Sequence, residues 1–147
     1  MTLRRQPIAR STKPIKRGRP IANGKRPRKK RKGGKAALGR ACDKLWSLIV
    51  RQHGSCKVCE KAPPAVVLQG AHGFSRRYRG TRWNLLNGFS LCSGCHVRLT
   101  HDPIGWDNWL RVAWGASIYA EMRRLAICGP KPDLAAVHAS LLAEWNR

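Results

Sequence analysis

Two pairs of cysteines form the pattern in this sequence that is most specific for a chemical site. Cys56 and Cys59 are separated by two residues, Cys92 and Cys95 repeat that spacing, and 32 residues lie between the pairs. Two residues between thiolates allow both sulfurs to reach one ion from a tight turn, and two such pairs complete the tetrahedral ligand set of a structural zinc ion. Two disulfides or four buried thiols are the alternatives. Because bound zinc contributes folding free energy directly, we expect a zinc-stabilised domain.

His72, Asn87 and His96 form a second pattern on the same segment. Histidine exchanges protons near neutral pH and binds metal ions, and the asparagine amide both donates and accepts hydrogen bonds. The pattern includes three stretches: AHGFSRR at 71–77, TRWN at 81–84 and LCSGCH at 91–96. Together with Asn87 they resemble the HNH endonucleases, especially the phage members, including the NinG-like recombination nucleases. The resemblance covers roughly residues 55–115, about 60 of the 147.

The resemblance implies both a fold and residue roles. In HNH enzymes two strands and a helix, the ββα-metal finger, present a histidine at the end of the first strand, an asparagine in the loop and a histidine on the helix. It therefore implies an α+β domain in which His72 is the general base for phosphodiester hydrolysis. Asn87 would orient that imidazole, and His96 would coordinate a catalytic Mg²⁺ or another divalent ion. The structural zinc would position the helix without touching substrate.

Each of these three residues also has a simpler interpretation. His72 can be a buried histidine that caps a strand, and Asn87 before Gly88 is a common turn pair. His96 can be a further zinc ligand or a residue on a helix surface. Their joint spacing favours the functional interpretation.

The sequence departs from the HNH pattern at Ala71. HNH members usually carry Asp or His directly before the first catalytic histidine, and that residue binds the metal. His101, five residues after His96, and the adjacent Asp102 are the nearest substitutes in the sequence. We therefore take His101 and Asp102 as candidate replacement ligands.

Arginines are concentrated between His72 and Asn87. They are Arg76, Arg77, Arg79 and Arg82, and Tyr78 and Trp83 are interleaved with them. The arginine fork matches phosphate oxygens and stacks on bases, so this loop is expected to hold a DNA backbone near the metal. Solvated loop arginines are the alternative.

The hydrophobic periodicity predicts the elements that position these residues. Apolar residues at helical spacing predict a helix over 38–52, which Gly54 ends. The remaining expectations are strands at 66–68 and 89–91, and helices at 93–99, 104–114, 118–127 and 134–145. Trp106, Trp109 and Trp114 are expected to pack against the finger. Cys42 and Cys128, which lack paired partners, are expected to be small core residues.

The N-terminal part of the chain carries the densest charge. The sequence has 30 Lys and Arg against 7 Asp and Glu, a formal net charge of +23, and residues 1–40 hold 16 of the basic residues and no acidic one. With few apolar side chains to offset the entropy of ordering, residues 1–37 are predicted to be a disordered arm. Its Lys29, Lys30, Arg31 and Lys32 are expected to bind DNA phosphates through counterion release. A solvated tail or a nuclear localisation signal has the same composition.

The composition also bears on location. The longest apolar stretches are about five residues, against roughly 20 needed to cross a bilayer, so no membrane partner is expected. No apolar core follows Arg4 and Arg5, so we expect no secretory signal and a cytoplasmic protein, in the host cytoplasm if a phage encodes it. Cysteines in that compartment are thiols or metal ligands more often than disulfides.

The sequence thus predicts a metal-dependent DNA endonuclease of the HNH type. Its domain covers residues 38–147, with a motif core at 55–115 and C-terminal helices at 116–147. The phage resemblance implies a role in DNA recombination or processing, with phage or host recombination or packaging proteins as partners. A noncatalytic zinc-finger protein that binds nucleic acid is the alternative, in which Ala71 marks a lost active site.

Overall fold

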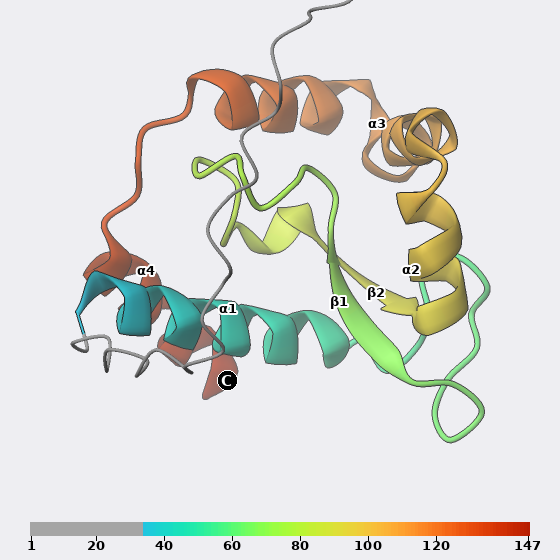
Figure 1. Cartoon of the computed structure of the whole chain (residues 1–147), viewed down its shortest axis with the longest axis horizontal. Coiled ribbons are helices and arrows are strands. Elements are labelled where there is room, and N and C mark those ends of the chain that lie inside the picture. Colours follow the sequence, from blue (N-terminus) through green and yellow to red (C-terminus); the bar gives the residue numbers. More distant parts are fainter. Residues whose placement is uncertain (1–33) are drawn as a thin grey trace, which may run out of the picture. The chain divides into compact units, whose positions relative to one another are not determined.

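A computed structural model describes residues 34–147 of the chain. The predicted arm, including Lys29, Lys30, Arg31 and Lys32, lies outside the described residues except for its last four positions. The elements in chain order are α1 (Lys35–Arg51), β1 (Leu68–His72), the 3₁₀ turn η1 (Leu85–Asn87), β2 (Gly88–Cys92), α2 (Ser93–Thr100), α3 (Pro103–Cys128) and α4 (Leu134–Trp145) (Figure 1). The domain is a small α+β fold. Residues 35–37, predicted to lie in the arm, belong to α1.

The two strands form an antiparallel pair, with Cys92 at one end and His72 at the other. Leu68 lies opposite Cys92, one of the paired cysteines, and His72 lies opposite Gly88. The prediction of a strand at 66–68 was wrong in position, because β1 begins at Leu68. Val67 is 72% exposed, so the apolar run that suggested the strand is not itself buried. The second predicted strand, at 89–91, is confirmed within β2.

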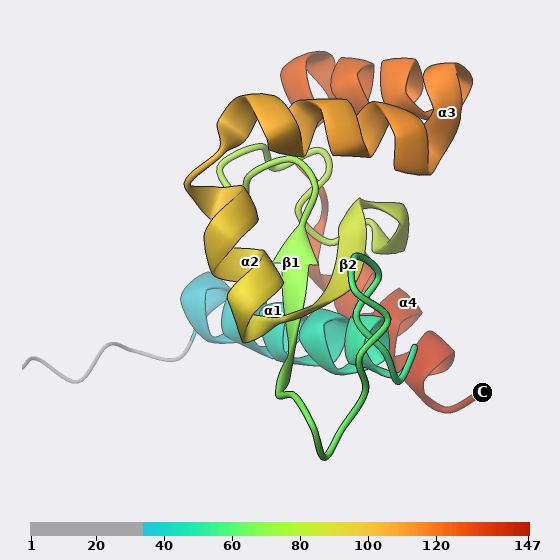
Figure 2. The ribbon, with the colours of Figure 1, turned by 90° about the vertical axis from the view of Figure 1, so that its right-hand side faces the viewer.

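Helix α1 covers one face of the sheet and α2 lies over the other (Figures 1 and 2), where side chains of α3 also pack. Alternation along β1 separates the two faces, since Gly70 approaches Trp46 of α1 while the buried Ala71 belongs to the core with Leu99. The close approach of α1 needs a glycine at position 88. A Cβ there would lie 2.3 Å from a methyl carbon of Val50.

The segment that follows β2 is helical, as predicted, but α3 is longer than either predicted piece. Asp102 caps α3 by accepting a hydrogen bond from the Gly105 amide at 2.8 Å, and Pro103 occupies the first turn. Gly115, with φ of 70°, interrupts the helical geometry, and the chain folds back there (Figure 2). The helices predicted at 104–114 and 118–127 are therefore the two limbs of α3.

Aromatic side chains of the first limb of α3 pack on the sheet, as predicted. Phe89 of β2 contacts Trp106, Trp109 and Trp114, with ring centroids 4.9 to 5.9 Å apart. Trp106 also donates a hydrogen bond from Nε1 to the Gly73 carbonyl at 2.8 Å. The limb is thereby fixed both to β2 and to the loop after β1.

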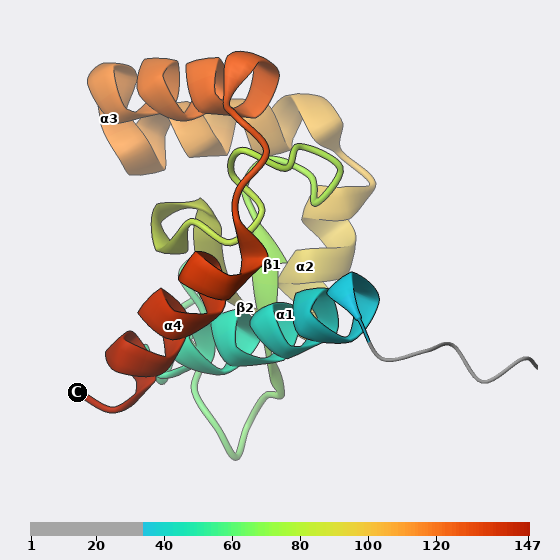
Figure 3. The same ribbon diagram turned by 90° about the vertical axis from the view of Figure 1, so that its left-hand side faces the viewer.

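Helix α4 spans the predicted residues and packs against α1 (Figure 3). Leu141 joins Cys42, Trp46 and Val50 of α1 in a second core cluster, so Cys42 is a core residue as expected. The same expectation was wrong for Cys128, which is exposed. It is the last residue of α3, where no other element covers it. None of the helices within 34–147 is long and apolar enough to span a membrane.

Candidate active site and metal centre

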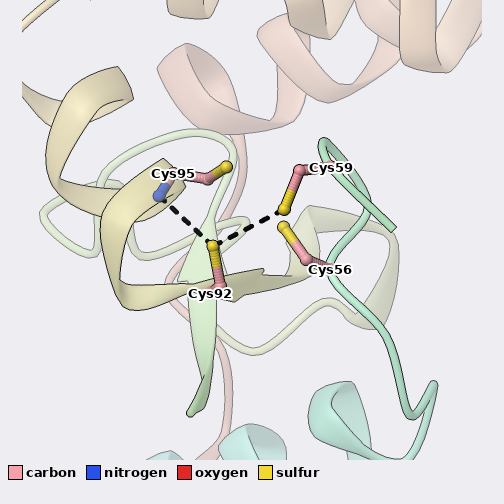
Figure 4. A group of neighbouring side chains, drawn as sticks. All are labelled: Cys56, Cys59, Cys92 and Cys95. Atoms are coloured by element: carbon pink, nitrogen blue, oxygen red, sulfur yellow. Dashed lines mark hydrogen bonds between the residues drawn. The ribbon is translucent and has the colours of Figure 1, made fainter. Parts of the chain in front are cut away.

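The four paired cysteines converge on one point (Figure 4). Their sulfur atoms all lie within 4.8 Å of one another, and the sulfurs of Cys59 and Cys92 are 3.8 Å apart. A zinc ion about 2.3 Å from each of four tetrahedral sulfurs requires sulfur separations of about 3.8 Å. The donor set and the spacing therefore fit a single structural metal ion such as zinc. We call these four residues the cysteine cluster.

Two turns hold the cysteine cluster together. Cys56 opens a turn that closes through hydrogen bonds from its own amide to the Lys61 carbonyl and from the Glu60 amide to its carbonyl. Cys92 ends β2 and caps α2, accepting a bond from the Cys95 amide at 3.4 Å. The Lys57 amide donates to the Ser90 carbonyl at 2.8 Å and so joins the first turn to β2.

The thiols of the cysteine cluster do not ionise independently. Burial raises the pKa of Cys56, but backbone N–H groups and the neighbouring Cys59 thiol outweigh it and lower that pKa overall. Burial and the other three cysteines raise the pKa of Cys95. The surroundings thus favour the thiolate of Cys56 and oppose that of Cys95, as expected for neighbouring thiols that share a site.

His72 stands at the end of β1, where one ring face and one ring nitrogen are constrained. Its ring stacks on Trp46 of α1 with centroids 3.8 Å apart and planes 15° from parallel. Its Nε2 lies 2.9 Å from the Arg82 carbonyl oxygen. Because a carbonyl only accepts, Nε2 carries the proton in the neutral ring and Nδ1 keeps a lone pair. Burial lowers the pKa of His72 to about 4, so the ring is neutral at pH 7.

Asn87 is fully buried and ties together the loop between the strands. Its Oδ1 accepts from the Phe74 amide at 2.7 Å, and its Nδ2 donates to the carbonyls of Phe74 and Thr81 at 3.0 and 3.1 Å. All of these partners lie in the loop that follows His72. Asn87 therefore acts on His72 through the loop and not by direct contact.

His96 lies on α2, and a residue of β1 orients its ring. Its Nδ1 is 2.7 Å from Oε1 of Gln69. The amide oxygen accepts, so Nδ1 carries the proton and Nε2 keeps a lone pair. Burial also lowers the pKa of His96. The metal-type cluster found within residues 34–147 contains the four cysteines and not His96, so this histidine is not placed as a further zinc ligand.

His72 and His96 line one cavity of about 560 Å³, which we call the histidine cavity. Other residues that line it are Asp43, Ser75, Arg76, Thr100 and Trp106. They come from α1, the loop after β1, α2 and α3, so the cavity forms only when these elements pack around the sheet.

The candidate replacement ligands do not line the histidine cavity, although the flanking Thr100 and Pro103 do. Neither His101 nor Asp102 is among its lining residues. His101 is an exposed residue at the C-cap of α2, and the Asp102 carboxylate is used to cap α3. Asp43 is the one carboxylate that lines the cavity. Both of its oxygens bind the Arg82 guanidinium, at 3.0 and 2.7 Å.

The loop arginines divide into two groups. Arg76 lines the histidine cavity, and Arg76, Arg77 and Arg79 are exposed. Arg82, which was also predicted to contact phosphate, pairs with Asp43 and is half-buried. Burial opposes ionisation of Asp43, but the bonds from Arg82 and Trp83 lower its pKa overall. This ion pair fixes the backbone of Arg82, whose carbonyl orients His72.

Sequence reasoning missed three residues of the site: Asp43, Trp46 and Gln69. Trp46 follows Cys42 and precedes Val50 by four residues each, so helical spacing could have placed it on the buried face. No local signal pairs Asp43 with Arg82, 39 positions later, or Gln69 with His96, 27 positions later.

Comparison of the chain with known protein families, with curated proteins and with solved structures finds no match. The functional interpretation therefore depends on the side chains and on the geometry of the two sites.

Proposed function

We propose that the chain is a metal-dependent DNA endonuclease of the HNH type. The observation that carries the proposal is the pairing of His72 and His96 in one cavity, each with one ring nitrogen bonded to a protein oxygen and the other holding a lone pair. Two oriented neutral imidazoles in one cavity supply a base and a metal ligand. The order β1, β2, α2, with Asn87 holding the loop, agrees with a ββα-metal finger.

Hydrolysis of a phosphodiester needs a water molecule that loses its proton as it attacks phosphorus. Nδ1 of His72 is the acceptor in our proposal, because Nε2 is committed to the Arg82 carbonyl. The lowered pKa keeps this nitrogen unprotonated at neutral pH, although it also makes the base a weak one. The stack on Trp46 and the bond to Arg82 hold the ring in one orientation.

The catalytic divalent ion would be held by Nε2 of His96. Such an ion neutralises charge on the phosphate and lowers the pKa of bound water. Ala71 offers no ligand, and the Asp43 carboxylate is paired with Arg82. The residues would therefore fit an ion that binds imidazole and takes its other ligands from water and phosphate. Imidazole suits Mn²⁺, Co²⁺, Ni²⁺ or Zn²⁺ better than Mg²⁺, which prefers oxygen ligands.

The charge of the loop supports a nucleic-acid substrate. Arg76 lines the histidine cavity, and the exposed Arg77 and Arg79 extend positive charge beyond it. Guanidinium groups beside the reacting phosphate bind its neighbours along the strand and position it. The resemblance to phage HNH enzymes supports DNA recombination or processing as the setting, with DNA as the partner.

The test is a nicking assay with the purified full chain. Supercoiled plasmid is incubated with the protein in Mg²⁺, Mn²⁺, Ni²⁺ or EDTA, and the conversion to nicked and linear forms is measured on gels. We expect cleavage that EDTA abolishes and that is faster with Mn²⁺ or Ni²⁺ than with Mg²⁺. Absence of cleavage with every ion would overturn the proposal.

A second candidate is a noncatalytic zinc-finger protein that binds nucleic acid. The observation in its favour is the lack of a free carboxylate in the histidine cavity, since Asp43 is the one acid that lines it and is paired. A gel-shift measurement on the same plasmid separates the candidates. Binding without nicking in any divalent ion would establish the second one.

A further inference from the structure

A second cavity lies where the start of α1, the loop between the strands, and the connection from α3 to α4 meet. Its volume is about 300 Å³, and five basic side chains line it: Lys35, Arg40, Arg79, Arg82 and Lys131. We call it the cationic pocket. Asp43 is the one residue that lines both this pocket and the histidine cavity.

The charges of the cationic pocket are not balanced by the domain. The Asp43 carboxylate is occupied by Arg82 through two hydrogen bonds. Within residues 34–147, no salt bridge involves the other four basic residues. Cations that share a recess repel one another, and a bound anion relieves that repulsion.

The start of α1 adds to the positive potential of this pocket. Ala36, in the first turn, lines the pocket, and Gly34 at the N-cap supplies no side-chain bond. The first turn also contains no acidic residue. The backbone N–H groups at this helix end carry partial positive charge that favours an anion.

One wall of the cationic pocket is apolar. Trp83, Pro132 and Leu134 contribute to it. The Trp83 ring is fixed by a hydrogen bond from Nε1 to Asp43 at 2.8 Å, and the Arg82 guanidinium lies 4.9 Å from its centroid. A simple inorganic anion has no apolar group that could pack on this wall, whereas a nucleotide carries a sugar and a base besides its phosphate. The volume lies at the small end of ligand sites, which suits a single nucleotide.

We propose that the cationic pocket binds a phosphate group of a nucleic acid, with the nucleotide that carries it, outside the candidate active site. The choice of a nucleic acid rests on the proposed function; the preference for an anion does not. Arg82 connects the two sites, because its side chain lines the pocket and its carbonyl bonds His72 at 2.9 Å. A phosphate held there determines which phosphodiester bond lies in the histidine cavity. The phosphate is either internal to a strand or a terminal 5′-phosphate.

The test compares two charge reversals in the full chain. Arg40→Glu with Lys131→Glu alters the pocket and leaves the loop arginines beside the histidine cavity in place. Lys44→Glu with Lys61→Glu is the control, since both of its residues are exposed and lie outside both cavities. Each pair changes the net charge equally. Binding of a 3′-labelled DNA duplex, with or without a 5′-phosphate, is measured by fluorescence anisotropy in EDTA, which prevents cleavage.

We expect the pocket pair to weaken binding by about tenfold or more and the control pair by about twofold. Equal losses in the two pairs would overturn the proposal, because general charge would then explain the binding. If the 5′-phosphate strengthens binding to the parent but not to the pocket variant, the site takes a strand end. Equal binding of both duplexes to the parent indicates an internal phosphate.

Two features of the test separate a loss of the pocket from misfolding and from a lack of nuclease activity. Circular dichroism and zinc content verify the fold, and Arg40→Gln with Lys131→Gln, expected to weaken binding about threefold, replaces the reversal if it misfolds. Because no cleavage is measured, a chain that never cuts DNA but shows the pocket effect would refute the proposed enzyme and support the pocket.

Discussion

The cysteine cluster and the histidine cavity use the same two strands but are assembled in opposite ways. The cluster takes its ligands from two turns, each with its pair of cysteines three positions apart. The cavity takes side chains from α1, β1, α2, α3 and the loop after β1. Its two histidines are oriented by Arg82 and Gln69, which lie far from them in sequence.

This difference separates a site that stabilises the fold from a site that depends on it. Loss of a cluster ligand removes a crosslink between two turns, so the whole domain is affected. Loss of either cavity histidine should leave the packing of Phe89 on the tryptophans of α3 intact, since neither histidine takes part in it. Variants of the two sites should therefore differ in whether they lose the fold or only the activity.

Removal of one cluster cysteine should have the largest effect. A structural zinc contributes about 10 kcal/mol or more to folding, comparable with the whole stability of a small domain. We expect Cys56→Ser and Cys92→Ser to abolish zinc binding, measured by metal analysis, and to unfold the domain, measured by circular dichroism. Cys128→Ser, at an exposed position, is the control and should behave as the parent. A folded parent protein without zinc would contradict this comparison.

Substitution of the candidate base should remove activity and spare the fold. We expect His72→Gln to slow plasmid cleavage by about 10²- to 10⁴-fold, because a positioned base contributes that much to proton transfer. Zinc content and DNA affinity should change little, since the base acts in the transition state. His53→Gln, at an exposed residue outside the cavity, should cleave at the parent rate. Parent-rate cleavage by His72→Gln would remove the central residue of the proposal.

Loss of the bond that orients His96 should have a smaller effect. Gln69→Leu leaves Nδ1 of His96 without its acceptor, so the ring no longer favours the form with a lone pair on Nε2. We expect the Mn²⁺ concentration for half-maximal cleavage to rise about 10- to 100-fold, the usual range for such supporting residues. The exposed Gln52→Leu is the matched control. An unchanged Mn²⁺ dependence would show that His96 does not hold the ion.

The smallest expected effect is a pH dependence of stability from His72. Its pKa of about 4 in the folded domain lies below the usual 6.5, so between these values the unfolded chain binds more protons. The free energy of unfolding should therefore fall as the pH falls from 6.5 towards 4. We expect about 1–2 kcal/mol, less than the full shift because the ring is partly solvated. Denaturant titrations should show a larger loss in the parent than in His72→Gln, where only His96 keeps a pKa lowered by burial.

Sequence alone predicted the elements that carry their own signals. The helix over 134–145 was predicted with its observed bounds, because apolar residues at helical spacing mark its length. Strand β1 was misplaced because the apolar Val67 lies outside it. The register depends on contacts between elements, such as the fit of Gly88 beneath Val50, which no local pattern records.

The same division applies to the candidate sites. The cysteine spacing predicted the cluster, since each pair is local. His72 and His96 were predicted by resemblance and line one cavity, but the expectation for Arg82 as a phosphate contact did not account for Asp43. A charged side chain on a loop has the same appearance in a sequence whether it faces solvent or a carboxylate on another element.

The stack of Trp46 on His72 also gives the protein an internal optical reporter. An imidazolium ring in contact with an indole quenches the emission of that indole. Among residues 34–147, the stack of Trp46 on His72 is the one recorded contact of this kind. The emission of Trp46 should thus fall as His72 gains its proton. The chain has six tryptophans, so the difference between the parent and His72→Gln isolates this one signal. The protonation state of the candidate base can then be followed in solution without a label.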